Sequence, residues 1–516
     1  MEKHENGRPG NPAVSPLPGL NPDRLTNEAT ASSHQPADGI LASPRYSRTR
    51  VCLLVLLLIA AAGMRIYGAL NDLWLDEIWS LEMVNTISSP LQVFTKIHHD
   101  NNNYLNSLWL YWCGFHGNWP GYRIPSIVAG VGSVLLAGMI GRRRNGRAAC
   151  FAMLLVAFSY VQILYSSEAR GYAEVVFFSF LSFYALEDYL EKQGWQSALL
   201  FSISSILGFA SHLIFLNFFC AAILWSGWRW MKSGLGAGRM IKAMLACHAA
   251  PAAFLMALYF VDIRHQTFGG GTENGPGVYV DSLAWTLGAP PGRLGTLSTA
   301  LLAVALFIAG LWLVRCEKSD AWIFFTGVIL AIPILLTMVR HSEVLYVRHF
   351  IVGMAFLLFL FSIVLAALSQ RGWPGRVVCV LLLAAYFALN GWHTVSLFKY
   401  GRGHYGDATR FLAEHTKEPI VTMGGDHDFR IATVLRFHAR ETMGNRQARY
   451  FLNSQMHSWP PGGPEWFISH EESFVDPALA KTQIIDGAGN NYELVKTFPT
   501  APLSGLHWFV YHNLAK

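Results

Sequence analysis

The sequence predicts an α-helical polytopic membrane protein with a small α/β domain outside the membrane at its C-terminal end. The 516 residues are 52% hydrophobic and only 14% charged, whereas soluble domains carry roughly a quarter charged residues. Several apolar runs approach the about 20 residues that a helix needs to cross the hydrocarbon core. From about residue 399 the runs stop, and Gly, Pro, Asn and His become common. These observations divide the chain into a tail, a membrane domain and an outer domain.

The N-terminal tail, residues 1–46, is rich in Pro, Gly, Ser and Asn. It holds too few apolar residues to order itself, so we expect it to be disordered. Arg45, Arg48 and Arg50 directly precede the first apolar run, 51–70. Because basic residues flank membrane spans on the cytoplasmic side, the tail is predicted to be cytoplasmic. A run that starts this far into the chain is not expected to be a cleavable signal peptide.

The membrane domain, residues 47–398, is predicted to cross the membrane eleven times. The aromatic stretch 104–119, within an outer loop of residues 71–121, is short, and if it crossed, the basic loop RRRNGR (142–147) would lie outside. We therefore place this stretch at the outer interface. The predicted spans are 51–70, 122–141, 148–166, 172–190, 196–212, 213–230, 241–261, 296–315, 321–339, 348–369 and 376–397.

The outer domain, residues 399–516, lies outside the membrane because eleven crossings end there. In it, DATRFLAEHT has helical spacing, and PIVTMGG and WFVYHNL have the composition of strands. We predict a small α/β domain. The segment Gly401-Arg-Gly at its start is predicted to be a linker.

The net charge of +6 does not indicate a nucleic-acid-binding protein, because Lys and Arg cluster in short loops between apolar runs. All seven cysteines lie between Cys52 and Cys379, and no two have metal-ligand spacing. They are interpreted as small packing residues. Membrane lipids, and not nucleic acid, are the expected partners.

Three carboxylates stand in LWLDEIWSLEM, directly after the first span: Asp76, Glu77 and Glu82. Carboxylates occur in any exposed loop, but here tryptophan and leucine would hold them against the membrane or a protein cleft. Carboxylates kept in apolar surroundings are costly and are commonly functional. Asp76 and Glu77 are therefore candidate site residues.

A second polar cluster, YSSEARGY, lies at the outer end of another predicted span. It contains Glu168, Arg170 and Tyr172, which we take as candidate substrate-binding residues. A structural ion pair between Glu168 and Arg170 is the alternative.

A third cluster, RHSEVLYVRHF, also lies at an outer span end and contains Arg340, Tyr346, Arg348 and His349. Such cations could anchor lipid headgroups. They stand on the side opposite to the positive-inside bias, however, and arginine recognises phosphate by bidentate hydrogen bonds. We expect a phosphate-binding site here.

Two further candidates lie at outer span ends. His212 interrupts an apolar run, either as a satisfied buried histidine or as a ligand. Asp100 follows His98 and His99, and this trio could hold a divalent metal. The metal ligands are otherwise unknown, and no other cofactor is predicted.

These features, in this order, resemble the membrane glycosyltransferases of the C superfamily, especially family 39 and its bacterial relatives among protein mannosyltransferases and lipid A aminoarabinose transferases. The matching stretches are LWLDEIWSL, HDNNNYLNSLWLYWCGFHGNWPGYRIPSI, LYSSEARGYA, SHLIFL and LYVRHFIVGMAFLLF. The resemblance covers roughly residues 50–400. It implies a bacterial inner-membrane enzyme that moves a sugar from a polyprenyl-phosphate donor to a glycan, lipid or protein acceptor on the periplasmic or extracellular face.

The resemblance also implies roles for individual residues. It assigns Asp76 as the catalytic base and Glu77 as its neighbouring acid, and it implicates Glu168 and Arg170 in substrate or metal binding. Arg348 matches the late arginine that contacts the lipid-linked phosphate. Inversion at the anomeric carbon is likewise implied only by the resemblance.

One departure from the family pattern affects the outer loop. Where relatives usually carry a proline pair, this chain has Asn101-Asn102-Asn103-Tyr104, so the donor and acceptor contacts of that region are not assigned. Two rival hypotheses stay open. One is a transporter or flippase of lipid-linked sugars, which predicts acids and broken helices near the midplane. The other is a non-catalytic assembly protein whose outer domain binds a partner.

Overall fold

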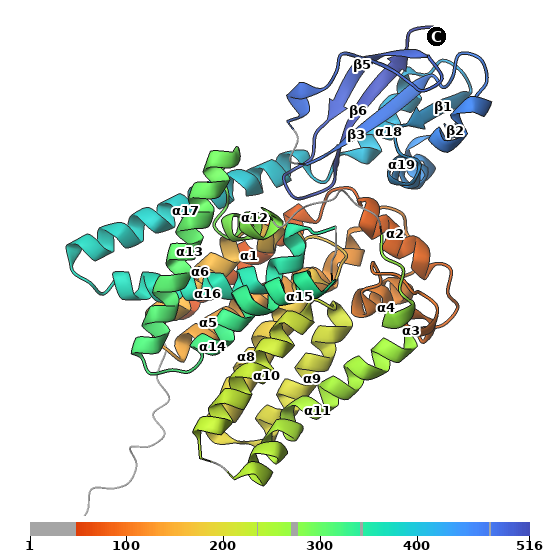
Figure 1. Ribbon diagram of the computed structural model, residues 1–516. Coiled ribbons are helices and arrows are strands. Elements are labelled where there is room, and N and C mark those ends of the chain that lie inside the picture. The colour runs from red at the N-terminus through yellow and green to blue at the C-terminus, as the bar shows by residue number, and fades with distance from the viewer. Residues whose placement is uncertain (1–47, 235, 270–276, 341–343, 474–475) are drawn as a thin grey trace, which may run out of the picture. The chain divides into compact units, whose positions relative to one another are not determined.

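The computed structural model describes residues 48–516 except 235, 270–276, 341–343 and 474–475 (Figure 1). The predicted tail, residues 1–46, lies outside the described residues. Residues 54–516 form one compact unit. Apart from the first turns of α1, all elements below belong to it.

The part of the chain before residue 401 is mainly helical, as predicted. Its helices are α1 (Arg48–Gly68), α2 (Leu75–Val84), α3 (Gln92–Thr95), α4 (Tyr104–Cys113), α5 (Ile124–Arg142), α6 (Gly146–Phe158), α7 (Tyr160–Tyr165), α8 (Tyr172–Lys192), α9 (Trp195–Ser211), α10 (Phe215–Lys232), α11 (Ala237–Val261), α12 (Gly277–Thr286), α13 (Arg293–Cys316), α14 (Trp322–Thr326), α15 (Ile332–Arg340), α16 (Ile351–Leu368) and α17 (Trp373–Tyr400).

Six helical segments within the described residues are long and apolar enough to cross a membrane, judged by length and composition. The chain is a multi-pass membrane protein. The other predicted spans coincide with α8, α9, α10, the α6–α7 pair and the α14–α15 pair. The count of eleven crossings stays a prediction. The segments that meet the criterion are Val51–Gly68, Pro120–Arg142, Ala237–His265, Arg293–Cys316, Val347–Leu368 and Trp373–His415.

The predicted span 148–166 is broken at Ser159, between α6 and α7. A broken helix leaves backbone groups without intrahelical partners, and distant side chains bind them here. The Tyr160 N–H donates to Asn390 Oδ1 at 2.8 Å. Arg65, fully buried, donates to the carbonyls at the end of α6 at 3.2 and 3.3 Å. Backbone groups on both sides of the break therefore have hydrogen-bond partners.

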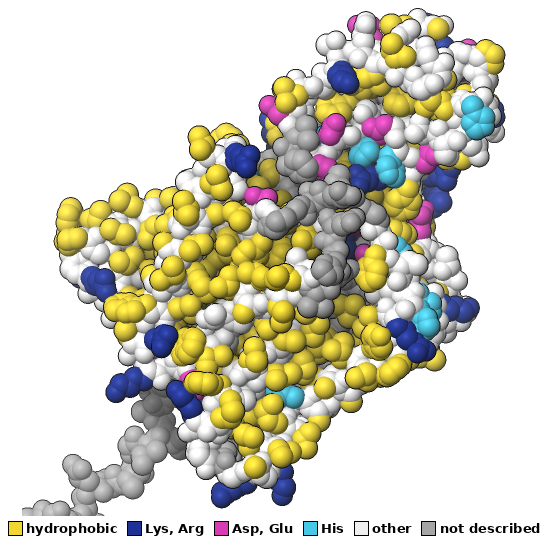
Figure 2. Space-filling model, in the orientation of Figure 1, with side chains coloured by type: hydrophobic (Ala, Val, Ile, Leu, Met, Phe, Trp, Pro, Cys, Tyr) yellow, Lys and Arg dark blue, Asp and Glu magenta, His cyan; other side chains and the backbone are white. Residues whose placement is uncertain are grey.

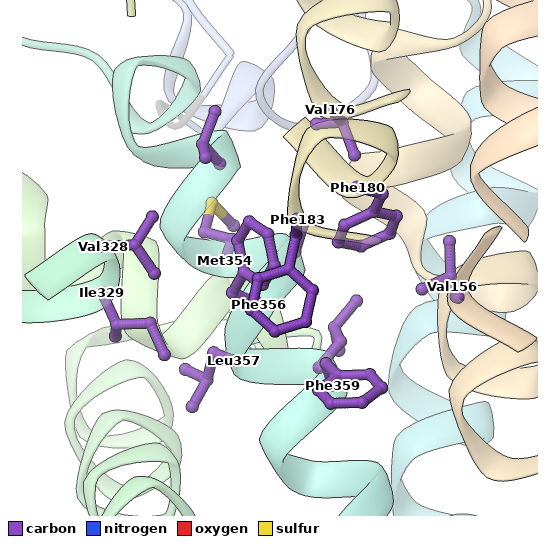
Figure 3. Packing of buried hydrophobic residues seen from close by; sticks show 14 of the residues in the cluster. Val156, Val176, Phe180, Phe183, Val328, Ile329, Met354, Phe356, Leu357 and Phe359 are labelled. Carbon is purple, nitrogen blue, oxygen red and sulfur yellow. The ribbon is translucent and has the colours of Figure 1, made fainter. Parts of the chain in front are cut away.

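Helix α16 lies at the centre of the membrane domain. It is hydrophobic on all sides and almost wholly buried, as expected of a helix surrounded by others. Figure 3 shows its side chains among those of α8 and of the segment that follows α14. The Phe356 ring lies 5.5 Å from that of Phe183 and 4.9 Å from that of Phe324, centroid to centroid. These edge and tilted contacts are favourable aromatic geometries.

The outside of the membrane domain is apolar on the face shown in Figure 2, and Lys and Arg side chains gather at the end away from the C-terminal sheet. Exposed leucines on α1, α9 and α13 belong to such apolar surface, with Leu56, Leu199 and Leu301 at 60, 49 and 71% exposure. This is the pattern of helices that face lipid.

The C-terminal part is the predicted α/β domain, with α18 (Tyr405–His415) and α19 (Asp428–Thr442). Its single six-stranded sheet has the order β2-β1-β3-β6-β5-β4. Strand β1 is parallel to β2 and β3, and the other pairs are antiparallel. The strands are β1 (Ile420–Gly425), β2 (Gln447–Phe451), β3 (Trp466–Glu472), β4 (Gln483–Ile485), β5 (Asn491–Phe498) and β6 (Leu506–Asn513).

Helices α18 and α19 of this domain contact the loop that precedes α2. The Nε2–H of buried His438 donates to the carbonyl of Leu73 at 3.0 Å, and the Gly406 N–H donates to Asp72 at 2.7 Å. The domain therefore contacts the segment that carries the predicted base.

The predicted linker is not a loose spacer, because Arg402 within it is fully buried. Its Nη2 donates to the carbonyl of Leu164, at the end of α7, at 2.9 Å. A Cβ atom on Gly505 would lie 1.8 Å from the Arg402 carbonyl oxygen, so only glycine fits at that close approach.

Candidate functional site

A cavity of about 1400 Å³ brings most of the predicted site residues together. Its wall comes from the outer loop with α2, the turn before α8, the α9–α10 junction, α12, the segment after α15 and the outer domain. The predicted residues that line it are Asp76, Asp100, Arg170, Tyr172, His212, Tyr346, Arg348 and His349. Glu77 and Glu168 lie outside its lining, and the side chain of Arg340 lies outside the described residues.

Asp76 lies in the first turn of α2, between two arginines. Its Oδ2 accepts a hydrogen bond from Arg170 Nη1 and lies 3.4 Å from Arg348 Nη2. Its backbone carbonyl accepts from the Asn101 side chain at 2.8 Å. The carboxylate is 14% exposed, so it is held in place while it still reaches the cavity.

Aromatic rings support both arginines. The Arg348 guanidinium lies 4.2 Å from the ring centroid of Tyr346 and 5.6 Å from that of Trp74, and Arg170 lies 5.1 Å from the ring of Tyr172. These are cation–π distances. Within the described part of the chain, Arg348 Nε and Trp74 Nε1 are buried donors without a hydrogen-bond partner. Such donors fit a ligand rich in acceptor oxygens.

Glu77 lies in a buried ion pair and does not reach the cavity. Arg123 donates to its two carboxylate oxygens at 2.7 and 2.6 Å, and the Ala169 N–H donates to Oε1 at 2.7 Å. Burial raises the pKa of Glu77, but Arg123 and the Ala169 N–H outweigh that effect and lower it overall. This geometry positions the start of α2 next to the turn that carries Arg170.

Arg123 binds the chain before α2 as well. Its Nη1 donates to the carbonyls of Ala69 and Asn71 at 2.7 and 2.6 Å, and its Nη2 to that of Asp72 at 2.9 Å. All its donors therefore have partners. Sequence reasoning did not single out Arg123. The signal that could have marked it is its place at an outer span end, in GYRIP, against the positive-inside bias.

Glu168 is fully buried and pairs with Arg402 of the supposed linker, with Oε2 3.1 Å from Nη1. Its Oε1 lies 4.0 Å from Arg170 Nε. Burial raises the pKa of Glu168, and Arg402 and Arg170 offset part of that effect. The alternative of an ion pair between Glu168 and Arg170 is thus present, as one link of a longer line of alternating charges, Arg402–Glu168–Arg170–Asp76–Arg348.

Three consecutive asparagines, Asn101, Asn102 and Asn103, bind the backbone of the outer loop through their side chains. Asn101 donates to the Asp76 carbonyl and to Ser80 Oγ. Asn102 donates to the carbonyls of Val93 and Ile97 at 2.8 and 2.9 Å. Side-chain hydrogen bonds thus shape the loop here.

His98, His99 and Asp100 form two separate contacts. His98 Nδ1 lies 2.6 Å from the buried Asp262, and His99 Nδ1 lies 2.8 Å from Asp100. Over the described ranges, no group of three His, Cys, Asp or Glu side chains could hold a metal ion. A divalent metal at this trio stays a prediction without a ligand set.

His212 lies against Tyr172, with ring centroids 4.7 Å apart. Both side chains line the cavity. Sequence reasoning missed the contribution of the outer domain, from which His427, Phe429, Arg430 and Glu472 also line the cavity. No local motif marks these four residues, since their place depends on how the sheet packs on α2.

No family model matches the sequence, and no curated protein is similar to it at the sequence level. Some solved structures have a similar backbone fold. ArnT from Cupriavidus metallidurans in the apo state has 12% identity and a TM-score of 0.48, over 89% of this chain and 98% of that one. The Archaeoglobus fulgidus oligosaccharyltransferase complex with Zn and sulfate has 10% identity and a TM-score of 0.47, over 80 and 67%. At such values the activity has to be inferred from the residues of the cavity.

Proposed function

We propose that the protein is a membrane glycosyltransferase that moves a sugar from a polyprenyl-phosphate-linked donor to an acceptor hydroxyl, with Asp76 as general base. The observation that carries the proposal is the placement of the Asp76 carboxylate between Arg170 and Arg348 at the cavity. A proton acceptor and phosphate-binding cations then lie within one site. The orphan donors of Arg348 and Trp74 suit phosphate oxygens.

The proposed step breaks one bond and forms another. The acceptor oxygen gives its proton to Asp76 and attacks the anomeric carbon, while the bond from that carbon to the phosphate oxygen breaks and its electron pair stays on the phosphate. Arg348 stabilises the departing phosphate, because its contact with Asp76 is the looser of the two and phosphate oxygens can replace it. Arg170 keeps the carboxylate in place.

The charges of the site balance in this scheme. If Asp76 and Glu168 are both counted as carboxylates, they and three arginines (Arg170, Arg348, Arg402) sum to +1, which matches the single negative charge of a phosphodiester donor. After transfer the phosphate is a monoester of about −1.5 to −2. Asp76 has then taken a proton, so the site has changed to +2. The proton on the base thus compensates for the charge gained by the leaving group.

The proposed location is a bacterial inner membrane, with the N-terminus in the cytoplasm and the cavity and outer domain on the periplasmic or extracellular face. The arrangement supports an enzyme over a transporter of lipid-linked sugars. A transporter site is expected near the midplane, but the break at Ser159 lies six residues from the end of α7, or about 9 Å from it. The cavity carboxylate Asp76 lies beyond the end of α1.

Replacement of Asp76 by Asn tests the proposal. We expect transfer to fall by at least about a hundredfold, because a general base commonly contributes that much, while expression and thermal stability stay close to wild type. The assay incubates purified protein with radiolabelled polyprenyl-phosphate sugars and membrane extract. Glu82→Gln is the matched control, since Glu82 lies on the same helix but outside the cavity lining. Near-normal transfer by Asp76→Asn would contradict the assignment.

A further inference from the structure

The outer domain contributes a polar wall to the cavity at the start of α19 and the end of β3. Arg430 and Glu472 lie on this wall, with Arg430 Nη1 3.3 Å from Glu472 Oε1. Their side chains are 15 and 20% exposed. The cavity therefore has a second set of charged groups that the proposed donor chemistry does not use.

Hydrogen bonds fix the position of Arg430. Asp426 accepts from the His470 N–H at 2.9 Å and lies 2.7 Å from His470 Nδ1, so Nδ1 carries the proton. His470 Nε2 then accepts from Arg430 Nη1 at 3.1 Å. In the described chain, Nε and Nη2 of Arg430 make no hydrogen bond. A preorganised guanidinium with free donors is a recognition group.

Tyr346 lines the same cavity as this wall and Asp76. Burial raises the pKa of its phenol, Arg348 and Arg430 oppose that shift, and Glu472 and Asp76 add to it. All four charges therefore act on one ring of the cavity lining.

Aromatic rings form the rim of this wall. The Trp79 ring lies 4.6 Å from that of Phe429 and 4.1 Å from that of His99, centroid to centroid. Phe429 is 40% exposed, and both Trp79 and Phe429 line the cavity. Exposed ring faces beside hydrogen-bonding groups suit a ligand with apolar C–H faces and polar edges.

We propose that this wall, made of Trp79, Phe429, Arg430 and Glu472, is the acceptor seat, and that the acceptor is an uncharged saccharide. The inference rests on the proposed transfer reaction. The two charged groups of the wall, Arg430 and Glu472, cancel, so the wall does not favour an anionic acceptor, in contrast to the donor side. Paired hydroxyls match the fork of Arg430 and the carboxylate of Glu472, and sugar ring faces pack on the aromatic rim.

The test measures glycan binding and lipid binding separately on the full-length protein in nanodiscs. A panel of neutral and anionic oligosaccharides probes the acceptor seat, with tryptophan fluorescence as the readout, and undecaprenyl phosphate probes the donor side. We expect wild type to bind neutral oligosaccharides. Arg430→Met and Trp79→Ala should weaken that binding about tenfold without a change in lipid affinity. Arg436→Met, an exposed position on the same helix, is the control and should bind both as wild type does.

The outcomes separate the two proposals. No binding of neutral oligosaccharides by wild type, binding of anionic ones only, or unchanged binding by Arg430→Met would overturn the acceptor seat. Loss of glycan binding in the Arg436→Met control would do so too. Glycan binding that depends on Arg430, together with no binding of undecaprenyl phosphate, would support the saccharide seat and contradict the donor assignment.

Discussion

Two adjacent carboxylates of the same loop have opposite environments. Asp76 reaches the cavity, whereas Glu77 is fully buried against Arg123. Successive residues of a helix point about 100° apart, so neighbours on α2 face different surroundings. The sequence predicted that acids would matter at this point. Only the family resemblance gave the two acids different roles, because their environments depend on Arg123 and on the turn at Ala169, both distant in the chain.

Removal of either partner of the buried pair should destabilise the protein. Glu77→Gln or Arg123→Met leaves one charge or its hydrogen-bonding groups unmatched in the interior, and breaking a buried pair costs about 3–5 kcal/mol. Thermal unfolding in detergent measures the loss. The double variant should lose less than the sum of the single variants, because the two residues interact directly.

A matched comparison is Lys192→Met, which breaks an exposed pair with Asp188. Exposed pairs contribute little, so this variant should unfold close to wild type. Wild-type stability of both Glu77→Gln and Arg123→Met would show that the pair does not position α2.

Among the elements, helices were the most predictable, because long apolar runs leave few alternatives in a membrane. Each predicted span coincides with a helix or a helix pair, and the segments predicted as helix and strands in the outer domain correspond to α18, β1 and β6. The break at Ser159 was missed. Its backbone partner, Asn390, lies in α17, and no local pattern around Ser159 announces it.

Helix α19 should make the stability of the protein depend on pH. Burial lowers the pKa of His438 below its ordinary value of 6.5, so the unfolded chain binds a proton more readily than the folded one. The contribution of neutral His438 to the free energy of unfolding is then complete above pH 6.5 and decreases as the pH falls below that value. Unfolding followed between pH 7.5 and 5.5, about one unit on either side of the ordinary value, measures this loss.

His438→Gln should flatten that pH dependence, since glutamine can still donate to the Leu73 carbonyl but does not titrate. His457→Gln, at an exposed position of the same domain, should leave it as in wild type. An unchanged slope in His438→Gln would assign the effect to other groups.

At the scale of the whole molecule, Arg402 joins the outer domain to the line of charges that ends at Asp76. The sequence predicted a membrane domain followed by an α/β domain, and the change of composition sufficed for that. It treated Gly401-Arg-Gly as a linker because two glycines flank the arginine. The pairing of Arg402 with Glu168 joins segments far apart in the chain, and only the packed structure brings them together.

Arg402→Met should loosen the outer domain. Glu168 would become a buried carboxylate without its nearest cation, so we expect lower thermal stability and faster proteolysis between α17 and α18. A second change, Glu168→Gln, should restore part of the stability, because it removes the orphaned charge.

Arg410→Met is the control, because Arg410 forms an exposed pair with Asp407 on α18. It should not accelerate cleavage between α17 and α18. Additive losses in the double variant of Arg402 and Glu168 would mean that the two residues act independently.

The close approach at Gly505 has an evolutionary consequence. The Arg402 carbonyl occupies the space in which any side chain at 505 would begin. The obstacle is a backbone oxygen, which every residue type at 402 carries, so related sequences that keep this close approach should retain glycine at the position of Gly505 whatever residue stands at 402. This fixed glycine could identify distant relatives whose overall similarity has faded.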